Sequence, residues 1–341
     1  MSFIEATRQN IRQEAVKPYT ASQNVSHDLA RTGLISRIFL HFVGTLTCTH
    51  ASKTTFTKAA EAPYNLAGRI RLTLNSGTDV YNVSGYGTYL MNMINRINYY
   101  LDNASCGVFA FGNTVSSSGT DNNVEFFLEI PVAANDRDAL GMLMLQSSQI
   151  VATLNIENNA ASVLMTDTDI TTALTGNWYV STEKFSIPAK AEDYPNLDTI
   201  HQVIEDVAPI SATGRNRFVI PRGNTYMKLI DIIKLNGAAN SADVEDIALK
   251  INTSNEPYNM TGRDIRAMQA QRYGRALPTG VFVYDFTYSM GLPGLGNFRD
   301  FIDSQDVSEF DQIINIASGA TLGSNNNTVR TIREMLVAVS A

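Results

Sequence analysis

The residues of this chain that could hold a metal ion are four histidines and one close pair of carboxylates, Asp167 and Asp169. A β-barrel metal site of the cupin type needs clustered histidines together with a carboxylate. Only His41 and His50 share a region, and their odd spacing places them on opposite faces of an extended strand. The two carboxylates lack the other oxygen ligands of a calcium loop, so we interpret them as a turn whose side chains cap backbone N–H groups. The sequence predicts no metal and no cofactor, and a structural role for all four histidines, His27 and His201 included.

Motifs for covalent catalysis are missing from the sequence. It contains neither the G-x-x-x-x-G-K-[ST] loop of phosphoryl transfer nor the G-x-S-x-G turn of acyl transfer. The glycine-rich stretch Gly291–Gly296 contains Pro293, which removes a backbone donor, and no Lys-Ser or Lys-Thr pair follows it. We interpret this stretch as a turn after a strand, and we expect that the protein is not an enzyme.

Two clusters of side chains could bind a larger ligand. Trp178 and Tyr179 could stack on a sugar, as in a lectin groove, but aromatic packing at the start of a strand is the favoured interpretation. The densest basic cluster consists of Arg215, Arg217 and Arg222. A chain with a pI of about 5.2 lacks the wide positive surface that phosphate contacts need. We therefore expect these arginines to pair with carboxylates, and we expect no direct contact with nucleic acid.

The composition indicates a globular protein with an unusual polar surface. Its 341 residues suffice for about two domains. The 26 basic and 33 acidic residues give a net charge of −7, and only 17% of the residues are charged. Asparagine and threonine, with 30 and 31 residues, together outnumber the charged residues. Such a surface can form hydrogen bonds without strong like-charge repulsion when many copies crowd together.

The sequence favours synthesis in a cytosol. The sequence contains no run of about eighteen apolar residues, which is the length that a membrane-spanning helix needs. Met1–Glu5 also lacks the basic and apolar regions of a secretory signal. In that setting we expect Cys48 and Cys106 to be reduced thiols.

Residues 1–30 are predicted to form a separate N-terminal arm with a short helix. Ser2 and Glu5 have the spacing of a capping box, and apolar residues at helical spacing continue to about Lys17. The other face of this predicted helix carries Arg8, Arg12 and Lys17 beside two glutamates. A solvated or partner-docked arm is the favoured interpretation, and contact with a membrane surface is the alternative.

From residue 31 the apolar residues alternate with a period of two, which predicts β-strands. The first domain, residues 31–190, has predicted strands at Ile38–Cys48, Arg69–Leu74, Val124–Ile130 and Ile150–Ile156. Turn clusters rich in Asn, Gly and Ser separate them, as in an antiparallel β domain. Leu90–Leu101 has helical spacing instead, and we expect this helix to lie against the sheets.

A polar stretch that contains proline separates the first domain from the second. Residues 191–214 are predicted to be a linker with a helix, whose apolar stripe is Ile200, Val203, Ile204 and Val207. The second domain, residues 215–341, has a predicted helix at Asp264–Tyr273 that begins after Thr261. Its predicted strands are Arg217–Ile220, Tyr226–Leu235, Asp246–Ile251, Val281–Tyr288, Phe310–Ile316 and Val329–Val339, the last with helical spacing still open.

The order of these elements is the same in both halves, which predicts an internal repeat. In each half a long strand and a second strand precede a helix. A strand that runs into a proline-containing loop comes next, followed by an Asp/Arg-rich segment and one more strand. The residue identities barely match, so the prediction rests on the order of the elements.

Several strings of residues, taken together, resemble the double jelly-roll major capsid proteins of tectiviruses and related icosahedral viruses with a membrane beneath the shell. The resemblance covers nearly the whole chain from Gly33 onward. In the first half it rests on Val124–Ala133 with Asp138–Gly141, on Gly33–Ile35 leading into Phe39–Thr49, and on Pro63–Leu66 before Arg69–Leu74. In the second half it rests on Ile265–Arg272 followed by Leu277–Tyr284.

This resemblance implies an all-β fold with a few short helices, in which two consecutive eight-stranded jelly rolls form a double jelly roll. Three chains would form a homotrimer with six similar blocks, a pseudo-hexamer that tiles the icosahedral capsid shell of a virion around an internal membrane. The implied partners are neighbouring capsomers and penton or minor capsid proteins. The implied function is lattice formation, without a reaction.

In this family the N-terminal helix lies on the inner side of the shell, near the membrane or bridging to an adjacent capsomer. Carried over to Ser2–Val16, this makes Arg8, Arg12 and Lys17 candidate contacts to lipid headgroups. The membrane would also keep the shell apart from packaged DNA. The alternative function is a jelly-roll spike or lectin-like receptor-binding protein of a virion, which Trp178 and Tyr179 would serve.

Overall fold

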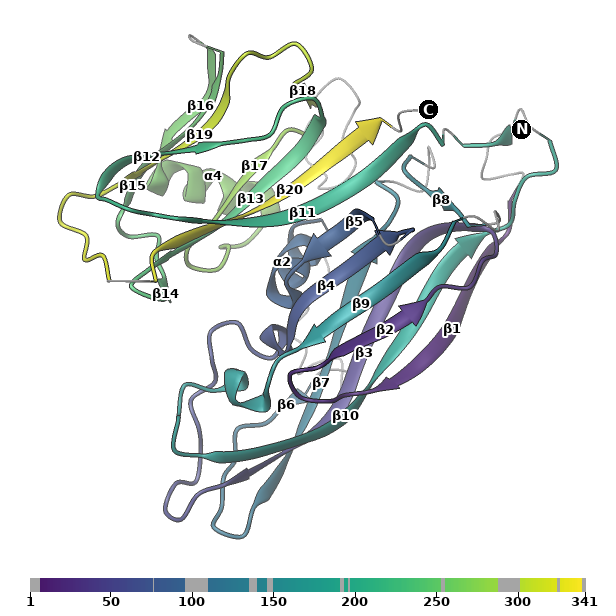
Figure 1. The fold of residues 1–341 in the computed structure, drawn as a ribbon. Coiled ribbons are helices and arrows are strands. Elements are labelled where there is room, and N and C mark those ends of the chain that lie inside the picture. The colour runs from purple at the N-terminus through teal and green to yellow at the C-terminus, as the bar shows by residue number, and fades with distance from the viewer. Residues whose placement is uncertain are drawn as a thin grey trace. The chain divides into compact units, whose positions relative to one another are not determined.

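Strands make up most of the two compact units into which the chain divides (Figure 1). The computed structural model describes residues 7–75, 77–95, 110–134, 140–145, 150–190, 193–195, 197–252, 255–287, 301–323 and 326–338. One unit comprises Met1–His201 with Val339–Ala341, and the other comprises Gln202–Ala338. The division therefore falls inside the stretch 191–214 that the sequence indicates as a boundary.

The first unit contains two antiparallel sheets with four principal strands each. One sheet has the order β1 (Gln9–Pro18), β10 (Thr171–Phe185), β3 (Leu34–Thr49) and β7 (Thr120–Pro131). The other has the order β2 (Asn24–Asp28), β9 (Ala152–Asn158), β4 (Ala67–Leu74) and β5 (Thr78–Val83). Shorter elements lie in the connections: β6 (Ala110–Phe111), β8 (Leu143–Met144), η1 (Tyr64–Leu66) and η2 (Ala161–Leu164).

The second unit has the same arrangement. One sheet has the order β11 (Thr199–Pro209), β20 (Thr328–Ala338), β13 (Thr225–Leu235) and β17 (Val281–Asp285). The other has the order β12 (Gly214–Val219), β19 (Phe310–Ile316), β15 (Val244–Ile251) and β16 (Asn255–Thr261). The short strands β14 (Ala238–Ala239) and β18 (Ile302–Asp303) pair with β13.

The pairing pattern shows that the two units are repeats of one fold. Within each unit the first strand pairs with the last, the last with the third, and the third with the sixth. In the described part of the chain, one α-helix follows the fifth strand of each unit: α2 (Gly85–Asn95) in the first and α4 (Gly262–Tyr273) in the second. This is the connectivity of an eight-stranded jelly roll, so the predicted all-β double jelly roll with an internal repeat is confirmed. We call the units the first roll and the second roll.

The alternation in the sequence locates the core of the first roll correctly. In β3 the side chains of Ile38, Leu40 and Phe42 are fully buried, and in β7 those of Phe126 and Leu128 are too. Phe42 and Phe126 pack against Trp178 of β10, with ring centroids 4.9 and 5.6 Å from its indole. The indole N–H donates to Asn158 Oδ1 of the opposite sheet at 2.9 Å, so the one polar atom of this side chain is satisfied.

Both α-helices begin where a hydroxyl side chain caps the backbone. Ser84 Oγ accepts from Gly87 N at 3.0 Å, and Thr261 Oγ1 accepts from Asp264 N at 3.1 Å. The helix predicted at Asp264–Tyr273 is confirmed, and it ends at Gly274 in the left-handed region. The helix predicted at Leu90–Leu101 begins earlier, at Gly85, and its residues 96–101 lie outside the described part of the chain.

Each helix places a buried amide against the edge of a sheet. Asn92 of α2 accepts from Glu129 N at 2.8 Å and donates to Glu129 O at 2.7 Å. Gln269 of α4 donates to Val283 O at 2.8 Å. Glu129 and Val283 lie in β7 and β17, the sixth strands of the two rolls. The two amides form hydrogen bonds with backbone groups at the edges of these strands. Buried polar groups need such partners, because no water can replace them.

The predicted N-terminal helix is wrong over its described residues. Gln9–Pro18 form strand β1, which pairs with β10 along its whole length, and residues 1–6 lie outside the described part. A bulge at Glu14 shifts the alternation by one residue. The sequence pattern of this strand therefore imitates helical spacing, and the long-range ladder with β10 overrides it.

The helix predicted within residues 191–214 is also wrong, because Thr199–Pro209 form strand β11. The buried side of this strand carries His201, Val203 and Glu205, while Val207 is exposed. With polar residues inside and an apolar one outside, the alternation by which strands are recognised is hidden. The two errors fall on the same element, the first strand of a roll. The last predicted strand is correct, since Thr328–Ala338 form β20.

Replacing the amide that caps the edge of β17 should destabilise the second roll. We expect Gln269→Ala to lower the free energy of unfolding by about 1–3 kcal/mol, because it leaves a buried carbonyl without its donor. The matched control is Gln271→Ala on the exposed side of the same helix, which should change stability by less than about 0.5 kcal/mol. Denaturant unfolding of both variants measures the difference, and equal effects would contradict the capping role.

Candidate functional site

The first and last strands of each roll are joined by charged side chains, and the first strand of the first roll contains two of the candidate cations, Arg12 and Lys17. In the first roll Glu14 of β1 is held by Lys184 of β10. In the second roll Glu205 and Asp206 of β11 pair with Arg330 and Arg333 of β20. In both rolls, therefore, ion pairs of the same kind, which we call the seam, hold the first strand to the last strand.

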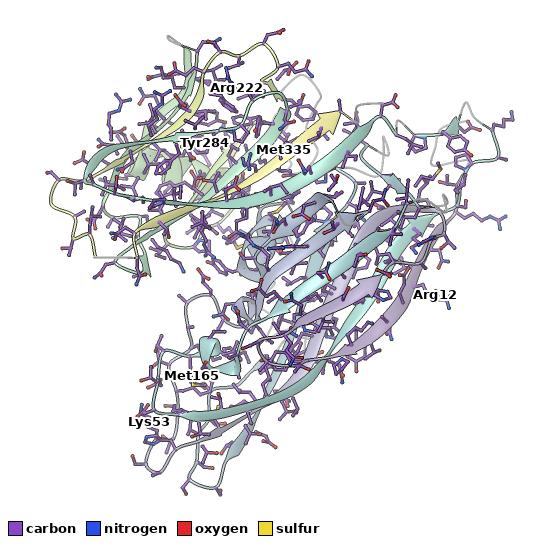
Figure 2. All side chains as sticks on the ribbon, in the orientation of Figure 1. Arg12, Lys53, Met165, Arg222, Tyr284 and Met335 are labelled. Carbon is purple, nitrogen blue, oxygen red and sulfur yellow. The ribbon has the colours of Figure 1, made fainter. Side chains whose placement is uncertain are left out.

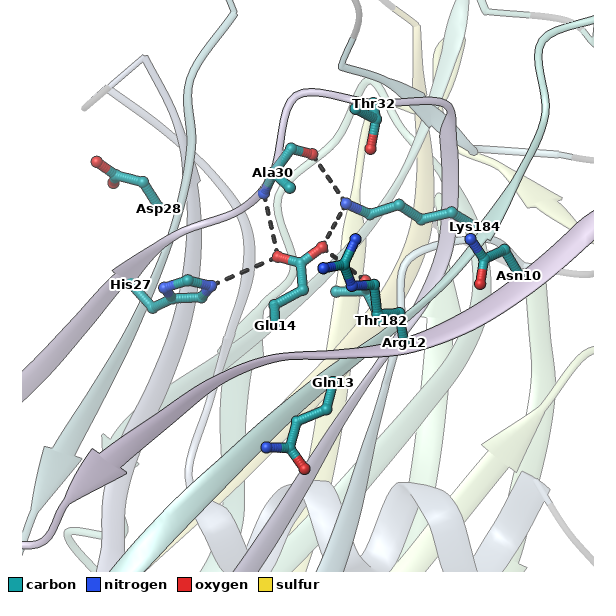
Figure 3. Close-up of a pocket in the computed structure, with 10 residues that line it drawn as sticks. All are labelled: Asn10, Arg12, Gln13, Glu14, His27, Asp28, Ala30, Thr32, Thr182 and Lys184. Carbon is teal, nitrogen blue, oxygen red and sulfur yellow. Dashed lines mark hydrogen bonds and ion pairs between the residues drawn. The ribbon is translucent and has the colours of Figure 1, made fainter.

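Glu14 is the centre of the first seam (Figure 3). Its carboxylate accepts from Thr182 Oγ1 at 2.8 Å, from Ala30 N at 3.0 Å and from the ammonium group of Lys184. His27 Nε2 lies 3.4 Å away. Lys184 Nζ also donates to Ala30 O at 2.8 Å. These bonds join β1, β10 and the segment that follows β2, around a hollow of about 260 Å³.

The ionised form of Glu14 is favoured in this setting. Burial by itself raises the pKa of the carboxyl, but the hydrogen bonds from Lys184, Ala30 and Thr182 outweigh it and hold the pKa below the ordinary value of 4.5. The bulge aims Glu14 at its partners, since the extra residue redirects its side chain. The seam therefore depends on a deprotonated carboxylate.

A cation between two carboxylates marks the same position in both rolls. In the first roll Arg37 of β3 contacts Glu129 of β7 at 3.0 Å and Glu183 of β10 at 2.9 Å. In the second roll Lys228 of β13 lies 3.6 Å from Glu334 of β20, and its register partner on β17 is Asp285. Burial lowers the pKa of Lys228, but Glu334 and Asp285 outweigh this effect, so the pKa lies above its ordinary value. Lys228 therefore stays charged although it is fully buried.

Asp231 sets the core of the second roll apart from that of the first. It is fully buried on β13 and accepts from Thr331 Oγ1 at 2.8 Å and from the amide of Gln312, which lies on the opposite sheet. Burial raises its pKa to about 7, against the effect of these two hydrogen bonds. The first roll fills its core with Phe42, Phe126 and Trp178 instead.

The structure places the three candidate membrane cations on or beside an edge strand. Arg8 precedes β1 and exchanges backbone and side-chain hydrogen bonds with Ser186, while Arg12 and Lys17 lie within β1. Arg12 lines the hollow around Glu14 (Figure 3) and is labelled on the edge strand in Figure 2. The helical face that grouped these residues in the sequence is absent from the described residues 7–18.

Sugar stacking by Trp178 is ruled out by its position. The indole is completely buried between the sheets, and only Tyr179 lies on the outer surface of β10. The favoured interpretation, structural packing, is therefore correct, although Trp178 lies in the middle of the strand. Cys48 is a buried free thiol whose pKa is raised by burial, and Cys106 and Gly291–Gly296 lie outside the described residues.

The carboxylates of Asp167 and Asp169 form ion pairs with the side chain of Lys53. Lys53 Nζ lies 2.7 Å from Asp167 and 2.6 Å from Asp169, among loops at one end of the first roll (Figure 2). Asp167 also accepts from Thr57 N at 2.7 Å, as the turn interpretation expects, and His50 lies 3.2 Å from Asp169. Over the described residues, no group of three or more His, Cys, Asp or Glu side chains could hold a metal ion.

The basic cluster behaves in part as predicted. Arg217 contacts Glu309 and Asp311 at 2.6 and 2.5 Å, which confirms its pairing with carboxylates. Arg222 instead donates to the backbone carbonyls of Val307 and Ser308.

In the described part of the chain, no helix has the length and apolar character needed to cross a bilayer.

Sequence reasoning missed the residues that make the seams and the buried cations. Glu14 and Glu205 lie in segments that were predicted to be helices, and Arg37 and Lys228 were not among the candidate residues. The signal available for the last two is a charged residue inside an otherwise apolar, alternating strand, because such a residue needs a partner across the sheet. No comparable signal exists for Glu14, since the bulge that orients it depends on a strand 170 residues away.

Comparisons with known proteins give the fold. No protein-family model and no curated protein sequence matches the chain. The crystal structure of the STIV major capsid protein superposes with a TM-score of 0.72 at 16% sequence identity, covering 97% of both chains. A chain from the atomic structure of Sulfolobus Turreted Icosahedral Virus has a TM-score of 0.70 at 17% identity, covering 97% of this chain and 91% of that one. The major capsid protein of bacteriophage PM2 has a TM-score of 0.57 at 10% identity, covering 98% of each chain. These structures are double jelly rolls, and this chain shares that fold over nearly its full length.

Neutralising Glu14 should weaken the first seam in a pH-dependent way. We expect Glu14→Gln to lower the free energy of unfolding by about 1–3 kcal/mol at pH 7, because the charged hydrogen bonds to Lys184 and Ala30 are lost. Since the folded pKa lies below 4.5, this stabilisation is present above about pH 4.5 and is lost as the pH falls through the folded value. Denaturant unfolding at pH 7 and pH 3 should show a smaller difference between the variant and the wild type at pH 3 than at pH 7. The control is Glu256→Gln on an exposed site, and a gap that stays constant with pH contradicts this role of the carboxylate.

Proposed function

We propose that this protein is a viral major capsid protein, a structural subunit without catalytic activity. The observation that carries the proposal is the double jelly roll over nearly the whole chain, with a TM-score of 0.72 to the STIV major capsid protein and 97% coverage of both chains. Similarity at this level is one of fold, so the assignment of function rests on how specifically a tandem pair of jelly rolls suits a shell.

The internal repeat supports a defined mode of assembly. One chain supplies two similar blocks, so three chains supply six, and a homotrimer can occupy a hexagonal lattice site with threefold chemical symmetry. The trimer is thus a pseudo-hexamer, and copies of it tile an icosahedral shell. The surface chemistry agrees with this, because 61 asparagine and threonine residues allow hydrogen bonds between crowded copies at low charge density.

The proposal includes the surroundings of the shell. The partners are neighbouring capsomers and penton or minor capsid proteins, and the shell of the virion encloses an internal membrane. The host cytoplasm is the place of synthesis. The membrane separates the protein from the packaged genome, which a net charge of −7 allows.

Contact of the N-terminal segment with that membrane is part of the same proposal. Arg8 and Arg12 are exposed and Lys17 is half-buried, and each cation near an anionic surface contributes about 1 kcal/mol. Serine at all three positions should abolish co-flotation of the protein with vesicles that contain anionic lipid. Flotation that is equally strong with and without the three cations would exclude them as the membrane contact.

The solution mass of the purified chain tests the proposal. Light scattering after size exclusion should give about 112 kDa, three times the chain mass of 37.4 kDa. An obligate interface of this class buries more than roughly 2,000 Å², so the trimer should persist at micromolar concentration. A clean monomer under these conditions would contradict the assignment as a capsomer.

A further inference from the structure

Each roll has one sheet that contains its first, last, third and sixth strands. The outer face of this sheet is buried in the second roll and partly exposed in the first. In the second roll this face carries Ile230, Ile232, Val281, Val283 and Ile332, none more than 2% exposed. In the first roll the same face carries half-buried aromatic side chains. We call it the first-roll face and define it by Phe39, His41, Phe127, Tyr179, Glu125 and Asp121.

The two faces correspond residue by residue along the third strand. Arg37 and Lys228 fix the register, because each is opposite a glutamate of the last strand, Glu183 or Glu334. Two residues further along are Phe39 and Ile230, and two further again are His41 and Ile232. The first roll thus has aromatic side chains where the second has aliphatic ones. Partly exposed aromatic side chains are enriched at protein interfaces.

The first-roll face is also acidic and hollowed. Glu125 is 26% exposed and lies 2.9 Å from His41, and Asp121 at the end of β7 is exposed. Glycine is present at two facing positions, Gly44 and Gly176, where an added Cβ would come within 2.7 Å of the neighbouring strand. A hollow of about 440 Å³, lined by both glycines, lies beside Glu125 and Tyr179.

The two equivalent helices differ in the opposite sense. Helix α2 has no charged residue, and nine of its eleven residues are buried. Helix α4 has three arginines and one aspartate, and only four of its twelve residues are buried. Arg263 and Gln271 are exposed on it, and Arg266 and Arg272 are half-buried. Within the chain, therefore, one helix and one sheet face are buried, while the equivalent helix and the equivalent face are largely exposed or half-buried.

We propose that helix α4 of one copy docks on the first-roll face of a second copy. The inference rests on the proposed function and names the surface through which its subunits meet. The charges are complementary, because the helix is basic and the face is acidic. Helix and face belong to different rolls, so the contact is head-to-tail, and such a contact repeated around an axis closes a ring.

Charge reversal tests this contact. One variant reverses the face with Asp121→Lys and Glu125→Lys, a second reverses the helix with Arg263→Glu, and a third combines all three changes. The control is Arg71→Glu, an exposed arginine on β4 in the other sheet of the first roll. Sedimentation equilibrium measures the association constant, and circular dichroism confirms that each variant is folded. Each single-side reversal should lower the association constant about tenfold or more, the combined variant should recover most of the loss, and the control should match the wild type.

The outcomes separate this inference from the proposed function. A wild type that forms trimers, together with reversal variants that associate equally well, would overturn the docking of α4 and leave the capsomer standing. Weakening without recovery in the combined variant would also overturn it, because the two charged sites would then act independently. A wild type that stays monomeric would overturn both.

Discussion

The constraint on which the rest of this structure depends is that every edge of a sheet must have its backbone groups satisfied. In each roll, the sheet that contains the first, last, third and sixth strands has two edges. At one edge the first strand pairs with the last, and a charged seam holds it: Glu14 with Lys184 in the first roll, Glu205 with Arg330 in the second. At the other edge an amide from the helix, Asn92 or Gln269, bonds to the backbone of the sixth strand. Both rolls therefore hold the two ends of this sheet in the same way, with a charged seam at one end and a helix amide at the other.

The sequence predicted those elements whose pattern is set by burial on one side. The strands around Phe42 and Phe126 alternate cleanly, and the helix capped by Thr261 carries its own start signal. The first strand of each roll could not be recognised, because several of its inward positions are polar and its partner is far away in the sequence. Glu14 meets Lys184 across 170 residues, and Glu205 meets Arg330 across the whole second roll. Local sequence patterns carry no information about such distant partners. The two strands were therefore predicted as amphipathic helices from the spacing of their apolar residues.

The internal repeat was predicted from the order of the elements. The structure shows that the two rolls share their backbone pairing but differ in the side chains at equivalent positions. A cation between two carboxylates persists at Arg37 and Lys228, although one is an arginine and the other a fully buried lysine. The core between the sheets is aromatic around Trp178 in the first roll, but in the second it contains Asp231, which burial makes a weak acid with a pKa of about 7. Conserved backbone pairing with different side chains is what a duplicated fold shows when its two copies occupy different surroundings.

The central claim is that two rolls in one chain serve as two blocks of a ring made from three chains. Electron microscopy of the purified protein tests this most directly, because it counts blocks as well as copies. The account predicts particles with six similar densities related by a threefold axis, with a β-sandwich resolved in each density. Particles that contain one chain, or rings with any other number of copies, would contradict it.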